Sequence, residues 1–401
     1  MKLATRCHVF VAGMAVLALA AAQGFAAPAA SKQSSSVNKP ASGKTAKVVG
    51  GPVTAVLEFR TWTSAKGNKL EAMMVDGAGK QVVLEDKGGV RKTVAIASLS
   101  QEDQDYIKQN ARKLKEAIPA SIKVELARRS RDNPGVKMDF VLVKQGEFTM
   151  GDGQFADSPP HKVKITRPFY IGKFEVTVAQ WTVFADATKY KTLAEQKNHG
   201  WGYKDGQIGH ADGLTWRTVN FKQGPDHPVV LINWYDAQEF CKWASKETGK
   251  TIRLATEAEW EYAARGPESL VWPWGNKEDL ARFNQADASF KKAGIGDNQW
   301  TQFGDDGFAF TAPVGSYSNA SWCGAYDMSG NAREWVQDVY TPDYYRSSPE
   351  VDPPGPAAGD LRARRGGSWN QHFYFGISAR RDEHPGTDAN DNLGFRCAVS
   401  L

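Results

Sequence analysis

The chain has 401 residues, of which 41% are hydrophobic and 24% charged, as in ordinary globular proteins. Its net charge is +5, but residues 1–52 hold six lysines and arginines and no acid. The rest of the chain is therefore close to neutral, which gives no basis for a nucleic-acid-binding surface.

The N-terminus has the pattern of a secretory signal peptide. Lys2 and Arg6 precede an apolar run from Val9 to Ala22, and small residues follow. A membrane anchor is the alternative, but the run is shorter than the ~20 apolar residues that span a bilayer. We therefore expect residues 1–27 to be removed, no transmembrane span after cleavage, and export to a periplasm, the cell surface or the outside of the cell.

A flexible linker and a small β domain are expected next. Residues 28–52 are rich in Ala, Ser, Lys and Pro and hold no aromatic residue, so they cannot bury apolar surface. Four short strands follow, within Val53–Thr63, Leu70–Val75, Gln81–Leu84 and Arg91–Ile96, with glycine turns between them. Short strands at this spacing predict a small barrel.

Three motifs in this β segment resemble the SH3-like homology domain of endocytic adaptors. They are Arg60-x-Trp62-Thr63, Gly67-x-x-Leu70-x-Ala72 and Leu99-Ser100-x-x-Asp103. In those adaptors the domain binds Asn-Pro-Phe-type peptides, but an adaptor function does not transfer to an exported protein. We therefore expect residues 53–110 to be an SH3-like domain for tethering or weak contact with a protein partner. A helical linker is expected over residues 111–137.

The large domain, residues 138–401, shows both strand and helix patterns. Asp139–Val143 and Phe169–Thr177 are typical of strands, and Val178–Thr188 of a helix. A second helix is expected to start at Asp236, with that residue as its cap. A third starts at Thr256, where Thr-Glu-Ala-Glu matches the capping box.

Several motifs of this domain resemble the formylglycine-generating enzyme family, also called sulfatase-modifying factors. They are Thr-Glu-Ala-Glu-Trp-Glu-Tyr from Thr256, Gly-Asn-x-x-Glu-Trp from Gly330, Gly-Gly-Ser-Trp from Gly366 and Asn-Leu-Gly-Phe-Arg-Cys from Asn392. The resemblance implies an α+β fold related to C-type lectins, with little regular secondary structure. Thirteen tryptophans and 38 glycines agree with a loop-rich core anchored by large aromatic residues.

The family's copper thiols are the main departure. In catalytic members two cysteines follow the Gly-Gly-Ser-aromatic element and bind copper. Here Gln371 takes the place of the first, and Gly376 or Phe375 that of the second. Since Cu(I) selects soft thiolates, copper is not expected. A non-catalytic protein that binds a peptide or small ligand is favoured; the alternative is a formylglycine-generating oxidase acting on sulfatase cysteines, or another catalytic variant. The candidate ligand cleft comprises Arg333, Ser368, Trp369, Asn370, Gln371, His372 and Tyr374.

The resemblance also implies two structural calcium sites, because oxygen ligands on tight loops suit this hard cation. The ligands of the first are the side chains of Asn284 and Asp306 and the carbonyls of Gln285 and Phe308. Those of the second are Asp327, the carbonyls of Gly330 and Ala332, and Glu334. The alternative is that these acids cap turns.

Three cysteines remain after cleavage of the leader, so one thiol is left over if two pair. The resemblance implies a disulfide between Cys241 and Cys397, with two buried reduced cysteines as the alternative. Cys323 is then a lone thiol, which we expect to be buried or inert.

Overall fold

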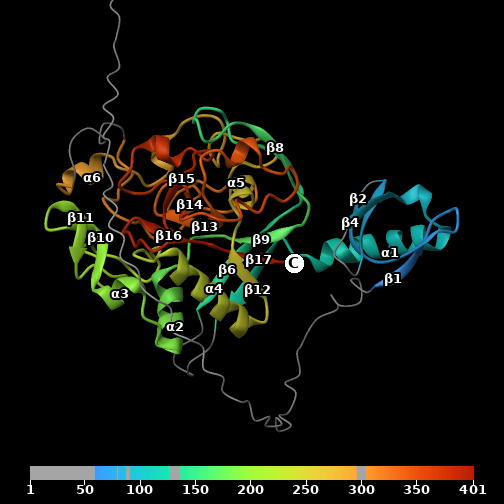
Figure 1. Ribbon diagram of the computed structural model, residues 1–401, viewed down its shortest axis with the longest axis horizontal. Coiled ribbons are helices and arrows are strands. Elements are labelled where there is room, and N and C mark those ends of the chain that lie inside the picture. The colour runs from blue at the N-terminus through green and yellow to red at the C-terminus, as the bar shows by residue number, and fades with distance from the viewer. Residues whose placement is uncertain (1–58, 79, 87–90, 127–135, 296–303) are drawn as a thin grey trace, which may run out of the picture. The chain divides into compact units, whose positions relative to one another are not determined.

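The structure is a computed structural model that describes residues 59–78, 80–86, 91–126, 136–295 and 304–401 (Figure 1). The predicted signal peptide, the linker of residues 28–52 and the start of the first strand lie outside the described residues. No helix within these ranges is long and apolar enough to cross a membrane.

An antiparallel sheet forms the first part of the described chain. Its strands are β1 (Arg60–Thr63), β2 (Lys69–Ala78), β3 (Gln81–Asp86) and β4 (Arg91–Ala95), in that spatial order, followed by η2 (Ile96–Ser98) and α1 (Gln101–Ala117). The Trp62 ring is buried, and its Nε1 donates to the Ala72 carbonyl at 2.8 Å. The expected order of strands is therefore present, while closure into an SH3-like barrel stays a prediction.

A five-stranded sheet organises the larger part. Its order is β12 (Thr251–Leu254), β17 (Cys397–Ser400), β9 (Phe169–Gly172), β6 (Lys137–Val143) and β5 (Ser121–Glu125). Phe140 of β6 packs in one apolar cluster with α2 (Val178–Thr188) and α4 (Trp234–Thr248), which lie beside each other (Figure 1). Val141 packs in a second cluster with α5 (Glu257–Arg265). The sheet therefore has helices against both faces.

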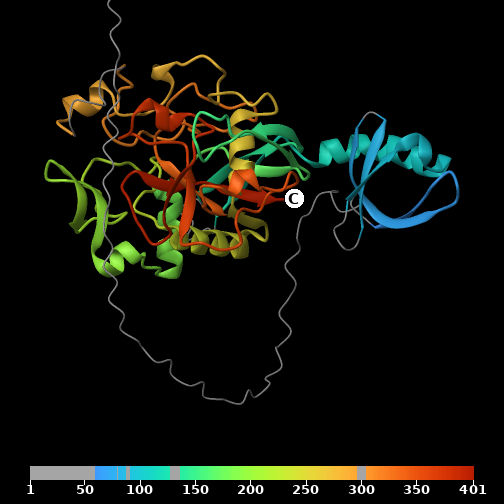
Figure 2. The same ribbon diagram turned by 45° about the horizontal axis from the view of Figure 1, so that its top comes forward.

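A four-stranded sheet carries the C-terminal motifs. Its order is β15 (Asp382–Pro385), β14 (Leu361–Arg365), β13 (Arg333–Val339) and β16 (Leu393–Phe395), with β13 and β16 parallel. Two hairpins are separate, β7 (Gly146–Met150) with β8 (His161–Ile165), and β10 (His199–Lys204) with β11 (Gln207–Asp212). The β10–β11 hairpin projects at the edge of this part in both views (Figures 1 and 2).

Short helical pieces complete the described part. They are α3 (Leu193–Lys197), η3 (Leu280–Arg282), α6 (Ala288–Lys292), η4 (Tyr344–Arg346) and η5 (Phe373–Gly376). Among the described residues between α5 and β13, only η3 and α6 are regular elements, and the rest of this segment is irregular. The mixture of helices, sheets and long loops confirms the predicted α+β class.

Three local predictions were wrong. Ser121–Glu125 is a strand rather than part of a helix, because it pairs along its whole length with β6. Strand β9 ends at Gly172 rather than continuing to Thr177. Helix α4 begins at Trp234, because Asn233 accepts from the Asp236 amide and is the cap.

Candidate functional site

The loop after β14 turns through two left-handed glycines. Gly366 has φ of 94° and Gly367 has φ of 71°, values that side chains other than glycine rarely adopt. A Cβ on Gly367 would also lie 2.7 Å from the backbone carbon of Phe375. The Gly-Gly pair therefore lets the loop fold back on itself and brings residues 368–376 next to the start of β13.

A polar network surrounds Gln371, the residue expected to replace the family's first thiol. The Oε1 atom of Gln371 accepts from Arg333 Nε at 2.5 Å and from Ser368 Oγ at 3.0 Å. The Nδ2 atom of Asn392 donates to Asn370 Oδ1 at 2.8 Å. The Gln371 oxygen therefore already has two donors, and the network offers hard oxygen and nitrogen atoms rather than sulfur.

The aromatic residues of the loop divide between surface and core. The rings of His372, Phe373 and Tyr374 lie 4.2 to 4.9 Å apart, and Tyr374 is 53% exposed. Burial lowers the pKa of His372, which favours the neutral form of its ring. Trp369 is fully buried and donates to the Asp391 carbonyl at 3.2 Å. Trp369 therefore supports the loop from beneath, and Tyr374 faces outward.

Two arginines that the sequence did not single out, Arg364 and Arg380, lie with the predicted cleft residue Arg333 at the inner end of the loop. Arg333 forms an ion pair with Asp382, and Arg364 NH2 lies 3.5 Å from the same carboxylate. The guanidinium carbon of Arg380 lies 4.1 Å from the centre of the Phe375 ring. The arginine runs at 362–365 and 380–381 were the available signal, but their meeting point depends on the pairing of β14 with β15.

The first expected calcium site contains an unsatisfied oxygen. Asn284 is buried, its Nδ2 donates to the Phe310 carbonyl at 2.7 Å, and its Oδ1 has no hydrogen-bond partner. Burial, with the nearby carboxylates of Asp287 and Asp305, raises the pKa of Asp306 to about 7. A buried oxygen without a donor and a carboxylate among other acids fit a hard cation.

In this first site the Asp306 carboxylate also accepts hydrogen bonds from the backbone of two loop segments. Its two oxygens accept from the backbone amides of Gln285, at 2.8 Å, and Phe308, at 2.9 Å. The carboxylate therefore holds together the two segments whose carbonyls are the other expected ligands.

In the second expected site, the carboxylate oxygens of Asp327 and Glu334 already accept hydrogen bonds from other protein groups. Asp327 accepts from the Gly315 amide at 2.6 Å and from Asn319 Nδ2 at 3.2 Å. The two oxygens of Glu334 face Arg396, at 2.5 and 2.6 Å, and one also accepts from Trp260. These residues therefore fit calcium less well than the Asp306 loop.

Excess negative charge still surrounds the second site. Glu175 is buried nearby, and its pKa is raised well above the usual value by burial and by the carboxylates of Asp327 and Glu334. Arg396 opposes this rise, because its positive charge favours the ionised carboxylate. In the part of the chain that the structure describes, no three His, Cys, Asp or Glu side chains converge as metal ligands.

The cysteines lie away from the loop. The sulfur atoms of Cys241 and Cys397 are both buried and lie 3.8 Å apart, unbonded. Cys323 contacts Ser321 Oγ at 3.3 Å and the Ala263 carbonyl at 3.5 Å. Burial raises the pKa of Cys323, which disfavours the reactive thiolate.

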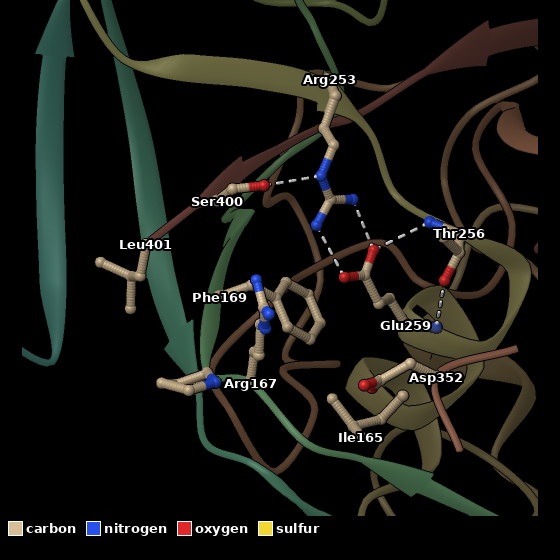
Figure 3. Close-up of a pocket in the computed structure, with 10 residues that line it drawn as sticks. Ile165, Arg167, Phe169, Arg253, Thr256, Glu259, Asp352, Ser400 and Leu401 are labelled. Carbon is tan, nitrogen blue, oxygen red and sulfur yellow. Dashed lines mark hydrogen bonds and ion pairs between the residues drawn. The ribbon is translucent and has the colours of Figure 1, made fainter. Parts of the chain in front are cut away.

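A hollow of about 350 Å³ opens where β17 ends (Figure 3). Arg253 crosses it in a bidentate pair with Glu259, at 2.6 and 2.7 Å, and donates to Ser400 Oγ at 2.9 Å. Glu259 also accepts from the Thr256 amide as part of the α5 cap. Because these polar groups bind one another, the hollow is a weaker candidate than the loop of residues 366–376.

Comparisons with known proteins agree with the motifs of the large domain. The "Sulfatase-modifying factor enzyme 1-like domain" matches residues 126–401. The formylglycine-generating enzyme of Bos taurus is 33% identical over 304 residues, 67% of this chain and 76% of that protein. The "Inactive C-alpha-formylglycine-generating enzyme 2" of Bos taurus is 31% identical over 299 residues, 66% of this chain and 89% of that protein.

A solved structure has a similar fold. PvdO from Pseudomonas aeruginosa superposes with a TM-score of 0.53 at 28% identity, covering 70% of this chain and 99% of that one. The similarity therefore extends from sequence motifs to the arrangement of the strands and helices.

Proposed function

The chain belongs to the sulfatase-modifying factor family, and from that membership we propose that it is an exported protein that binds a ligand without transforming it. The loop of residues 368–376, which follows the family's Gly-Gly pair, contains no cysteine. The relative named an inactive formylglycine-generating enzyme 2 supports the existence of such members.

The hydrogen bonds of Gln371 are the observation that carries the proposal. Its side-chain oxygen accepts from Arg333 and Ser368, where a catalytic member would present a thiolate to copper. An amide oxygen is a hard ligand and a poor partner for Cu(I). The site therefore suits recognition of polar groups better than activation of oxygen.

The second thiol position supports the same view. A Cβ on Gly376 would lie 3.0 Å from the Phe283 ring, which would have to shift by a few tenths of an ångström, and in ordinary contact with Trp272 at 3.4 Å. Phe375, the other possible equivalent, packs against the Arg380 guanidinium instead. Neither residue carries a thiol, so neither supplies the soft ligand that Cu(I) prefers.

We propose that calcium stabilises the large domain and takes no part in chemistry. Asn284, Gln285, Asp306 and Phe308 would hold one ion, which would supply a positive charge to the unsatisfied Asn284 oxygen and the Asp306 carboxylate. The second set, Asp327, Gly330, Ala332 and Glu334, is a weaker proposal because Arg396 already neutralises Glu334.

Export and the N-terminal module complete the proposal. The basic and then apolar leader of residues 1–27 supports export, and the 28–52 segment supports a tether. The sheet β1–β4 would serve as the SH3-like module and contact a protein partner. After export, the Cys241–Cys397 pair would be able to oxidise to a disulfide.

The identity with a formylglycine-generating enzyme is the specific reason to keep oxidation of a sulfatase cysteine as the second candidate. The purified chain is incubated with copper, oxygen and a peptide bearing Cys-x-Pro-x-Arg, and the peptide is analysed by mass spectrometry. No aldehyde is expected above a metal-free reaction or above the same peptide with serine for cysteine. Copper-dependent aldehyde would reverse the choice between the two candidates.

A further inference from the structure

We propose that Arg333, Arg364 and Arg380 form a pocket for a carboxylate group of the ligand, and that Asp382 fills this pocket until the ligand displaces it. The inference rests on the proposed binding function and names the chemical class that the site would accept. We call these three arginines with Asp382 the arginine pocket.

The fold brings the four residues together from three segments. Arg333 begins β13, Arg364 lies on β14, Arg380 precedes β15, and Asp382 is the first residue of β15. Arg364 and Asp382 stand directly opposite each other in the antiparallel pairing of β14 with β15. A small hollow between them is also lined by Arg365, Gly366, Gly367 and Phe375. The arginine pocket is therefore continuous with the Gln371 loop.

The arginine pocket holds three positively charged guanidinium groups and one carboxylate, which pairs directly with two of them. Arg333 is 2% exposed and Arg364 12% exposed, yet the one carboxylate within 4 Å of either is Asp382 among the described residues. The Nε atoms of Arg364 and Arg380 are buried without a hydrogen-bond partner. Glu383, Asp157 and Asp388 act on these arginines only from farther away. Buried charge is costly without a partner, so an added anion would be stabilised here.

Other buried arginines of the domain differ from those of the arginine pocket, because each has a close carboxylate partner of its own. Arg365 pairs with Glu257 and Glu261, Arg381 with Glu257, and Arg396 with Glu334. Each of these side chains has a carboxylate within 3.1 Å. In the arginine pocket two guanidiniums share one carboxylate, and Arg380 has no ion pair within 4 Å among the described residues. Burial accordingly lowers the pKa of Arg364 to about 10.

The present occupant indicates the chemistry of the ligand. Asp382 places a carboxylate between Arg333 and Arg364, and planar guanidinium groups match carboxylates through paired hydrogen bonds. Because the hollow has no room for a further group, a ligand carboxylate must take the place of Asp382 rather than join it. Removal of the Asp382 charge should therefore strengthen binding, whereas a purely structural ion pair predicts lost stability and no gain in affinity.

Titration calorimetry on the full chain tests the arginine pocket, with succinate as the probe, its neutral diamide as the control and sulfate as a second anion. Succinate is expected to bind and the diamide not to bind. D382N should bind succinate at least fivefold more tightly, and R364Q at least tenfold more weakly. R362Q removes the same charge two residues away, where Arg362 stacks on Trp234, and should leave affinity unchanged.

The outcomes separate this inference from the proposed function. If D382N gains no affinity, or R362Q weakens binding as much as R364Q, the arginine pocket is wrong, whatever the aldehyde assay gives. If succinate binds as expected while copper-dependent aldehyde forms, the pocket stands and the non-catalytic function fails. Sulfate binding more tightly than succinate would overturn the choice of carboxylate. R380Q replaces R364Q if the latter does not fold.

Discussion

Asp391 is a buried acid that holds the β10–β11 hairpin against the C-terminal segment. Its Oδ2 accepts from the Tyr203 amide at 2.6 Å, while its Oδ1 has no partner. Burial raises the pKa of Asp391 to about 7. In the unfolded chain an aspartate has a pKa of about 3.9, so folding favours the protonated form.

Asp391→Asn is therefore expected to change the dependence of stability on pH. Between pH 4 and pH 7 the folded state binds the proton more tightly, so the contribution of Asp391 is full below about pH 4 and is lost as the pH rises to about 7. D391N should be more stable than the wild type at pH 8, by an amount on the order of 1–3 kcal/mol, and similar at pH 4. Urea unfolding at both values checks this. D343N, at an exposed acid, is the control; a destabilised D391N at pH 8 would contradict the prediction.

Cys241 and Cys397 form the second residue-scale prediction. Their sulfurs lie 3.8 Å apart, so a small side-chain movement brings them to bonding distance. We expect a disulfide in the exported protein, and its reduction should lower the free energy of unfolding by up to about 4–5 kcal/mol for so long a loop. Peptide mapping without reductant checks the pair. Alkylation of Cys241 in that experiment refutes it, and Cys323 should be alkylated only after unfolding.

Caps set the ends of the main helices. Thr177, Asn233 and Thr256 each begin a capping box, in which side chain and backbone bond reciprocally over three residues. The boxes at Thr177 and Thr256 agree with the predicted starts of α2 and α5. At α4 the sequence offers Asn233 and Asp236, and Asp236 serves as the third residue of the box rather than as the cap.

Asn233→Ala should destabilise the protein by about 1–2 kcal/mol, because the Asp236 amide loses its acceptor in a buried position. Asn233→Ser keeps an oxygen acceptor and should retain most of the stability. Chemical unfolding of both variants measures the difference. Equal losses for the two would mean that packing rather than the cap is responsible.

The Asp306 loop provides the second prediction at this scale. Calcium should raise the melting temperature and a chelator should lower it, because the ion would satisfy oxygens that no helix or sheet pairs. Asp306→Asn should remove most of this response. Asp305→Asn is the matched control, since Asp305 is an exposed neighbour that pairs with Lys292. A calcium response that persists in D306N and is lost in E334Q would move the ion to the second site.

Buried ion pairs connect the sheets of the whole domain. Arg396 lies between β16 and β17, pairs with Glu334 of β13, and donates to the Gly172 carbonyl of β9 at 2.9 Å. Trp260 of α5 donates to the same Glu334 at 2.7 Å. These contacts join both sheets and a helix at one point, so their geometry depends on the entire fold.

Arg396→Met should therefore destabilise the domain by about 3–5 kcal/mol, because it leaves Glu334 buried without its cation. The double variant R396M/E334L removes both charges and should recover part of the loss. Chemical unfolding of the single and double variants measures this coupling. A double variant less stable than R396M would show that the hydrogen bond from Trp260 to Glu334 outweighs the cost of the buried charge.

The sequence by itself determined the family, the α+β class and the starts of α2 and α5, because motifs and caps depend on residues only a few positions apart. Tertiary structure decided the rest. Ser121–Glu125 becomes a strand only because β6 offers a partner, against the local helical pattern. Likewise, Arg333, Arg364 and Asp382 are scattered in the chain and meet only through the pairing of β13, β14 and β15, since contacts between distant segments leave no local pattern.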